Sequence, residues 1–141
     1  MKEKILNTLK TLGFNLEQVE NFGYLFKYEG INYVWMTETD DDKFLSIVIP
    51  GILEKPDGES ISFYKLVDGL NSSLKYVKAC VVSDSIWLVY EHELFEDEDV
   101  ERLISRMIVH LDAAIRIFHN RMEELVNGED ENNGDNETTE K

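Results

Sequence analysis

The sequence predicts an α+β protein in which an antiparallel sheet is packed by helices. Apolar residues recur every three or four positions at residues 5–12, 61–70 and 100–125, which is the spacing of one helix face. Between these segments the apolar residues alternate with their neighbours, which is typical of strands. Short polar turns separate successive alternating runs, so the strands are expected to pair as antiparallel hairpins. The predicted order of elements is α-βββ-α-ββ-α.

Chain length and composition favour one globular domain. The 141 residues are 43% hydrophobic and 11% aromatic, with only two prolines. Residues 128–141 carry six acidic residues, one lysine and no apolar residue, and such a segment cannot offset its own ordering entropy. We therefore expect a single domain over residues 1–126 and a disordered acidic tail over residues 127–141.

The first third of the chain predicts a short helix and a hairpin. Gly13 follows the first apolar stripe, where a residue in the left-handed conformation is expected to end the helix. Alternating residues over 22–28 and 31–35 predict two strands, many of whose residues are aromatic. The pair Glu29 and Gly30 between them is suited to a tight hairpin turn.

Proline and glycine divide the middle of the chain. Residues 37–43 (TETDDDK) predict a polar turn, and residues 44–49 predict a third strand that the proline-glycine pair at 50–51 ends. Residues 55–58 (KPDG) predict another turn. The apolar spacing beyond it predicts a second helix that closes near Asn71.

The second half predicts another hairpin and a long final helix. Alternating residues over 76–82 and 86–91 flank the turn residues 83–85. Asp97 and Asp99 then stand where acidic residues favour a helix start. The apolar stripe that follows persists for about 30 residues, so at roughly 1.5 Å per residue the helix reaches about 40 to 45 Å. This is longer than one small sheet requires, and the far end is expected to cover another surface.

Net charge limits the classes of partner. There are 29 acidic residues against 14 basic ones, a formal charge of −15. Non-specific binding to nucleic acids and to anionic membranes depends on clustered Lys and Arg. We therefore expect neither a nucleic-acid partner nor a membrane partner.

Cysteine content and the first residues favour a cytoplasmic location. The single cysteine, Cys80, has no second cysteine in the chain with which to form a disulfide. Residues 1–13 contain spaced lysines and no long apolar run, unlike a signal peptide or a membrane span. A cytoplasmic protein is therefore expected.

The order of elements, clearest in the carboxyl-terminal half, resembles a known fold. The strings YVKACVV, IWLVYEHEL and VERLISRMIVHLDAAIRIF follow one another as two strands and a helix with an acidic start. In this order and hydrophobic rhythm, residues 1–126 resemble the type III secretion chaperone fold and the YbjN-domain family of bacterial sensory transduction regulators. The resemblance implies a small acidic cytosolic homodimer that binds another polypeptide.

The histidines do not form a catalytic or metal-binding pattern. His92 alternates with Glu91 and Glu93 on a strand, so its imidazole lies on the opposite face from both carboxylates. His110 and His119 are nine residues apart on one helix and are expected to point to opposite sides. Each is therefore expected to be an isolated side chain.

The remaining reactive residues also favour a protein that is not an enzyme. The acidic run at residues 40–42 lacks the glycine and glutamate of a calcium loop and is expected to keep a turn solvated. Cys80 lies mid-strand among valines, as inert structural thiols do. No glycine-rich phosphate-binding motif occurs. We therefore predict no catalytic residue, no metal and no cofactor.

Both faces of several predicted strands are apolar. Leu25, Val34 and Val89 alternate with neighbours that are also apolar. A sheet with one face in water alternates apolar with polar residues instead. Three covers remain open for the second face: a helix of the same chain, a second copy of the chain, or a bound peptide.

Four aromatic residues are the predicted partner-binding residues: Tyr33, Trp35, Trp87 and Tyr90. Large aromatic side chains contribute a disproportionate share of the binding energy at interfaces. Ordinary core packing is the alternative for each of them.

Function is predicted on the same basis. The preferred hypothesis is a non-enzymatic, chaperone-like or regulator-like homodimer that holds an unidentified protein or peptide. The alternative is a small-ligand-binding domain or enzyme with a pocket between the sheet and the long helix, walled by Cys80, His92 or His110. An acidic mimic of nucleic acid is a third hypothesis.

Overall fold

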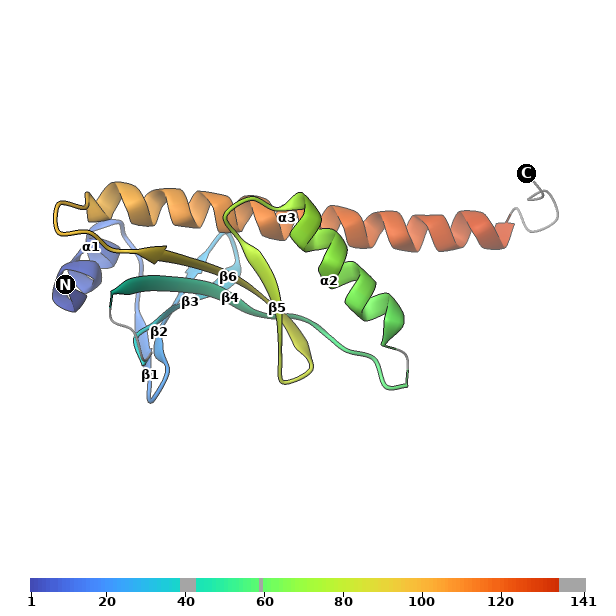
Figure 1. Ribbon diagram of the computed structural model, residues 1–141, viewed down its shortest axis with the longest axis horizontal. Coiled ribbons are helices and arrows are strands. Elements are labelled where there is room, and N and C mark those ends of the chain that lie inside the picture. The colour runs from blue at the N-terminus through green and yellow to red at the C-terminus, as the bar shows by residue number, and fades with distance from the viewer. Residues whose placement is uncertain (39–42, 59, 135–141) are drawn as a thin grey trace.

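An antiparallel sheet with helices packed on one face forms the protein, as the α+β prediction requires (Figure 1). The computed structural model describes residues 1–38, 43–58 and 60–134, with backbone alone for 126–134. Within these residues there are three helices and six strands. In chain order they are α1 (Lys2–Thr11), β1 (Glu17–Val19), β2 (Gly23–Tyr28), β3 (Ile31–Met36), β4 (Phe44–Glu54), α2 (Ile61–Ser73), β5 (Lys78–Val82), β6 (Ser85–Glu93) and α3 (Val100–Gly134).

The sheet has the strand order β1-β2-β3-β4-β6-β5, and every neighbouring pair is antiparallel. The chain leaves β4, passes through α2 to the far edge at β5, and returns to pair β6 with β4. In Figure 1, α3 runs along the length of the sheet, with α1 near one end and α2 near the other. The final helix therefore spans the whole domain.

The core lies between α3 and one face of the sheet. Ile104, Met107 and Leu111 of α3 are fully buried there, as are Ile47 of β4 and Leu88 of β6. We call this side of the sheet the helix-covered face. At about 25 cal/mol per Å² of buried apolar surface, each such side chain contributes about 1.5 to 3 kcal/mol.

Both hairpin turns follow the predicted chemistry. Glu29 and Gly30 have positive φ angles of 52° and 77°, as a two-residue turn with matching twist requires. Ser83 and Asp84 join β5 to β6 with φ angles of 49° and 64°. The second turn is made without glycine, in a conformation that aspartate tolerates better than most residues.

Strand β4 corrects one prediction. The pair Pro50 and Gly51 was expected to end the strand, yet β4 continues to Glu54. The register with β6 shifts between Ile49 and Leu53, because Gly51 adopts a φ of 57° there. A proline without an N–H and a glycine with positive φ are accommodated as a bulge in a long strand.

Strand β1 is a further difference from the prediction. It was not predicted, because its three residues carry no apolar alternation. It pairs with β2 beginning at Gly23, where an added Cβ would lie 2.0 Å from the Trp35 carbonyl oxygen. Only glycine fits this contact between β2 and β3.

Helix α3 continues to Gly134, past the predicted domain end at residue 126. A helix that is already nucleated gains one hydrogen bond for each further residue, so it extends without burying apolar surface. Residues 127–134 belong to this helix, and residues 135–141 lie outside the described residues.

An asparagine of α2 closes the outer edge of β5. The Ala79 N–H donates to Asn71 Oδ1 at 2.7 Å, and Asn71 Nδ2 donates to the Ala79 carbonyl oxygen at 3.0 Å. One side-chain amide thus takes the place that a neighbouring strand would occupy. An edge strand protected in this way is less open to pairing with another chain.

Replacing Asn71 tests this contact. Asn71→Ala removes both hydrogen bonds to Ala79, so the free energy of unfolding should fall by about 1 to 2 kcal/mol in chemical denaturation. Ser72→Ala is the matched control, because the Ser72 hydroxyl bonds only to the Asp68 carbonyl of its own helix. It should change stability by less than about 0.5 kcal/mol. Equal effects of the two substitutions would contradict a specific role for Asn71.

Candidate functional site

Three of the four predicted partner-binding residues lie in the core. Tyr33 is 0% exposed, Trp35 3% and Tyr90 6%, all on the helix-covered face. Tyr33 stacks on Phe26 with ring centroids 5.5 Å apart, and Trp35 stacks on Tyr24 at 5.2 Å. These three side chains offer no surface to a partner in this structure, because their own chain already covers them. Core packing, the alternative for each, describes their positions.

Trp87 lies on the other face of the sheet. Its neighbours Ile86 and Leu88 point to the helices, so its indole points away from them. The ring stacks on Phe22, from the turn after β1, with centroids 5.8 Å apart. Trp87 is half-buried and remains the predicted contact residue with an accessible side chain.

The second face of the sheet is only partly hidden within one chain. At its centre Val34 is 3% exposed and Val48 1%, since they pack against each other across β3 and β4. Toward the margins Phe44 is 42% exposed and Val82 38%. All the helices described pack on the opposite face. We call this apolar surface the open face, made of Phe22, Phe44, Cys80, Val82, Trp87 and Val89.

The residues of the alternative pocket prediction are not brought together. Cys80 lies half-buried on the open face, opposite Trp87 in the register. His92, on the other face, has its Nε2 3.5 Å from Glu98 Oε1. His110 lies on α3 near Tyr90. The acidic run at residues 40–42 lies outside the described residues.

The exposed Tyr76 ring packs against Tyr90 and His110. The Tyr76 ring lies 5.9 Å from that of Tyr90 and 4.7 Å from that of His110. Tyr76 has a φ of 68°, and the Val77 N–H donates to the Lys75 carbonyl oxygen at 2.7 Å, closing a tight turn. This turn delays the start of β5, which alternation alone placed at Tyr76. Burial and then the nearby Tyr76 raise the pKa of Tyr90 above its ordinary value.

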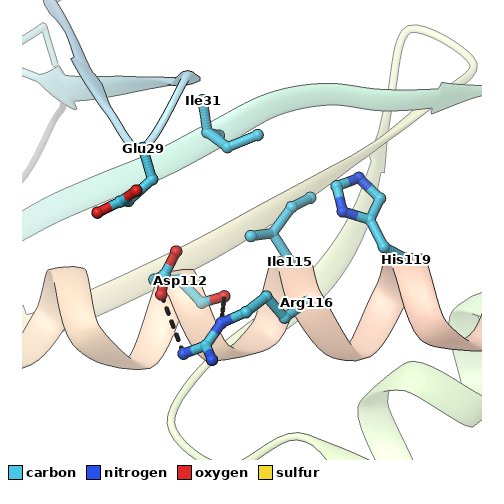
Figure 2. A pocket seen from close by; sticks show the side chains of 6 residues that line it. All are labelled: Glu29, Ile31, Asp112, Ile115, Arg116 and His119. Atoms are coloured by element: carbon cyan, nitrogen blue, oxygen red, sulfur yellow. Dashed lines mark hydrogen bonds and ion pairs between the residues drawn. The ribbon is translucent and has the colours of Figure 1, made fainter.

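A cavity lies between the β2–β3 turn and the middle of α3 (Figure 2). Its volume is about 450 Å³, within the range of small-ligand sites. Glu29 and Ile31 lie on the turn side, and Asp112, Ile115 and His119 point from α3 toward the sheet, whereas the Arg116 side chain runs back along the helix to Asp112 (Figure 2). The lining residues are Glu29, Ile31, Asp112, Ile115, Arg116 and His119. This cavity lies between sheet and long helix, as the alternative hypothesis expected, but other residues wall it.

The charges in this cavity are unequally paired. Arg116 Nη2 lies 3.0 Å from Asp112 Oδ2, and Arg116 Nε donates to the Asp112 carbonyl oxygen at 3.4 Å. No ion pair to Glu29 occurs among the described residues. Two carboxylates and one guanidinium leave a formal charge of −1 with His119 neutral. The uncompensated charge is therefore negative and belongs to Glu29.

The Tyr33 hydroxyl is buried and has no hydrogen-bond partner among the described residues. Burial raises the pKa of this hydroxyl well above its ordinary value, and the Asp112 carboxylate raises it further. Tyr28 and Glu29 also raise this pKa, and Arg116 lowers it. A buried hydroxyl with no partner costs about 1 to 3 kcal/mol.

The sequence did not indicate this cavity. The pattern around Glu29 predicts only a turn, and no motif in the sequence singles out Asp112 or Arg116. The available signal was the hairpin itself, because a tight turn at residues 29–30 faces whatever helix covers the sheet.

Comparisons with known proteins give no match: no family model and no curated protein sequence matches the chain. A search of the described residues finds no group of three or more His, Cys, Asp or Glu side chains able to hold a metal ion. Of the helices in that part of the chain, none combines the length and apolarity needed to cross a membrane.

Removing the Tyr33 hydroxyl should stabilise the protein. Tyr33→Phe keeps the ring contacts and eliminates a buried polar atom that lacks a partner. We expect the free energy of unfolding at neutral pH to rise by about 1 kcal/mol in urea denaturation. Tyr64→Phe, at an exposed hydroxyl on α2, is the control and should be neutral. A loss of stability in Tyr33→Phe would indicate that the hydroxyl is hydrogen-bonded in solution.

Alkaline unfolding tests the same hydroxyl independently. The pKa of the Tyr33 hydroxyl is raised in the folded state. The contribution of this shift to the free energy of unfolding is therefore complete below the ordinary pKa of about 10 and is lost as the pH rises toward the folded-state pKa. Between pH of about 9 and about 11, Tyr33→Phe should therefore lose about 1.4 kcal/mol less stability than the natural chain. Parallel pH profiles for the two proteins would show that this tyrosine ionises normally.

Proposed function

We propose that this chain forms a cytoplasmic homodimer that holds a segment of another polypeptide and does no chemistry on it. The open face carries this proposal. Val82 is exposed on it near the half-buried aromatic pair of Trp87 and Phe22, and Phe44 is exposed at the other end of β4. An apolar surface flanked by polar residues is typical of a binding site for protein.

The outer edge of β5 is partly blocked, which favours binding of a partner across the open face over strand addition. Addition of a strand at β5 is opposed by Asn71, which already occupies the outward N–H and carbonyl of Ala79. A partner segment on this side therefore gains more from side-chain contacts with Trp87 and Val82 than from extending the sheet. Aromatic side chains of this kind contribute strongly to interface energy.

The apolar stripe of α3 supports the dimer. Ile115 is 3% exposed and Phe118 4%, but Met122 is half-buried and Leu125 is 51% exposed. Exposure rises along this stripe as the helix extends beyond the sheet (Figure 1). A second copy presents the same stripe, so a twofold pairing would cover both at once. The resemblance to YbjN-domain and secretion-chaperone proteins implies the same association.

Charge supports the choice of partner. The chain carries a formal charge of −15, which repels nucleic acids and anionic membranes and attracts basic polypeptides. In a reducing cytoplasm the accessible Cys80 stays a thiol and adds to the apolar surface of the open face.

Three variants, each with one exposed apolar residue replaced by glutamate, distinguish dimer formation from peptide binding. We expect Leu125→Glu to convert a dimer into a monomer in light scattering, because it places charge in the stripe of α3. Val82→Glu should leave the dimer intact but weaken binding to an array of immobilised twelve-residue peptides about tenfold or more. Val109→Glu, which alters a valine 58% exposed on α3, is the matched control and should change neither.

Circular dichroism establishes that each variant remains folded. A natural chain that stays monomeric at high micromolar concentration and binds no peptide of the array would show the proposal to be wrong. So would peptide binding that Val82→Glu and Val109→Glu reduce equally, because general charge repulsion would then account for both.

A further inference from the structure

We infer that the cavity between the Glu29 turn and α3, which lies on the helix-covered side of the sheet and apart from the open face, receives a basic side chain, lysine or arginine, of a polypeptide partner. This inference rests on the proposed function and names the chemistry of the partner. The groups that favour it are the Glu29 carboxylate and the apolar side chains of Ile31 and Ile115.

The cavity is built on two rigid elements. Glu29 lies in the two-residue turn of a hairpin whose register pairs Tyr28 with Ile31. On the other side, Asp112, Ile115, Arg116 and His119 project from successive turns of α3. Both elements are fixed by the core, so the cavity needs little rearrangement to bind. Binding sites held in this way lose less conformational entropy.

Electrostatics favour a cation. The carboxylate of Glu29 has no ion pair within the described part of the chain, while Arg116 is already held by Asp112 and by its own helix. An incoming ammonium or guanidinium would meet an unpaired negative charge. An incoming carboxylate or phosphate would instead have to compete with Asp112 for Arg116 and would face Glu29. The net charge of the whole chain acts in the same direction.

Apolar walls favour a cation on an alkyl chain. Ile31 from the hairpin and Ile115 from α3 are the apolar residues of the cavity lining (Figure 2). The methylene groups of lysine or arginine pack against such surfaces while the charged end reaches a carboxylate. A hydrated metal ion gains nothing from these walls and would find only two carboxylates, whereas calcium takes six to eight oxygen ligands.

The test uses the full chain labelled with ¹⁵N and three capped pentapeptides, Gly-Gly-X-Gly-Gly, in which X is lysine, arginine or norleucine. The lysine and arginine peptides should produce saturable shifts in the amide signals of residues 29–31 and 112–119. The norleucine peptide, which matches the lysine stem without its charge, should bind at least about fivefold more weakly.

Two variants assign the binding to this cavity. Glu29→Gln should weaken the lysine peptide about fivefold or more, because it removes the unpaired charge. Asp84→Asn is the matched control, since it neutralises one carboxylate in the other two-residue turn of the sheet.

The outcomes separate this inference from the function on which it rests. Equal binding of the three peptides, or equal effects of Glu29→Gln and Asp84→Asn, would overturn the cavity as a cation site and leave the open face untouched. Tighter binding of 1,5-diaminopentane than of the lysine peptide would overturn a polypeptide side chain as the occupant. Saturable binding of lysine peptide in the cavity of a chain that is monomeric and inert on the peptide array would sustain the site and refute the proposed function.

Discussion

The packing of α3 against a single face of the sheet is the constraint on which the rest of the structure depends. Ile104, Met107 and Leu111 are buried between the helix and the central strands β4 and β6. Because α3 covers one apolar face of the sheet, the other apolar face is either covered by small local contacts or left accessible. Because the helix is 35 residues long, its end leaves the core with part of its apolar stripe uncovered. The two surfaces proposed for association, the open face and the far end of the apolar stripe of α3, therefore both result from the packing of α3 on one face of the sheet.

Much of this arrangement could be predicted from the sequence. Alternation and turn chemistry located the strands of both hairpins, and the pair Glu29 and Gly30 adopts the conformation expected of it. The same register pairs Phe26 with Tyr33, so a tight turn already placed Tyr33 and Trp35 on one face. Alternation could not say which face the helices would take, because both faces are apolar. That choice decided that Tyr33, Trp35 and Tyr90 became core residues while Trp87 remained accessible.

The cavity could not be predicted, for a different physical reason. Glu29 and Asp112 belong to segments far apart in the chain, and each is ordinary where it stands, one in a turn and one in a surface ion pair with Arg116. Their relation arises only when the helix crosses the hairpin. At Pro50 the local sequence was misleading. The proline-glycine pair predicted the end of a strand, but β4 continues because it pairs with β6 on both sides of the bulge. Local signals are weakest where long-range pairing is strongest.

The Asn71 contact carries a consequence for the chemical lifetime of the protein. Both ends of one amide are in use, the oxygen as acceptor and the nitrogen as donor to Ala79. Hydrolysis of that amide to a carboxylate, the usual ageing reaction of asparagine, would keep the acceptor and set a second oxygen against the Ala79 carbonyl. Repulsion there would detach the helix end from the strand and expose an unpaired β edge. An aged population of this protein would thus be the one prone to join copies edge to edge into fibrous aggregates.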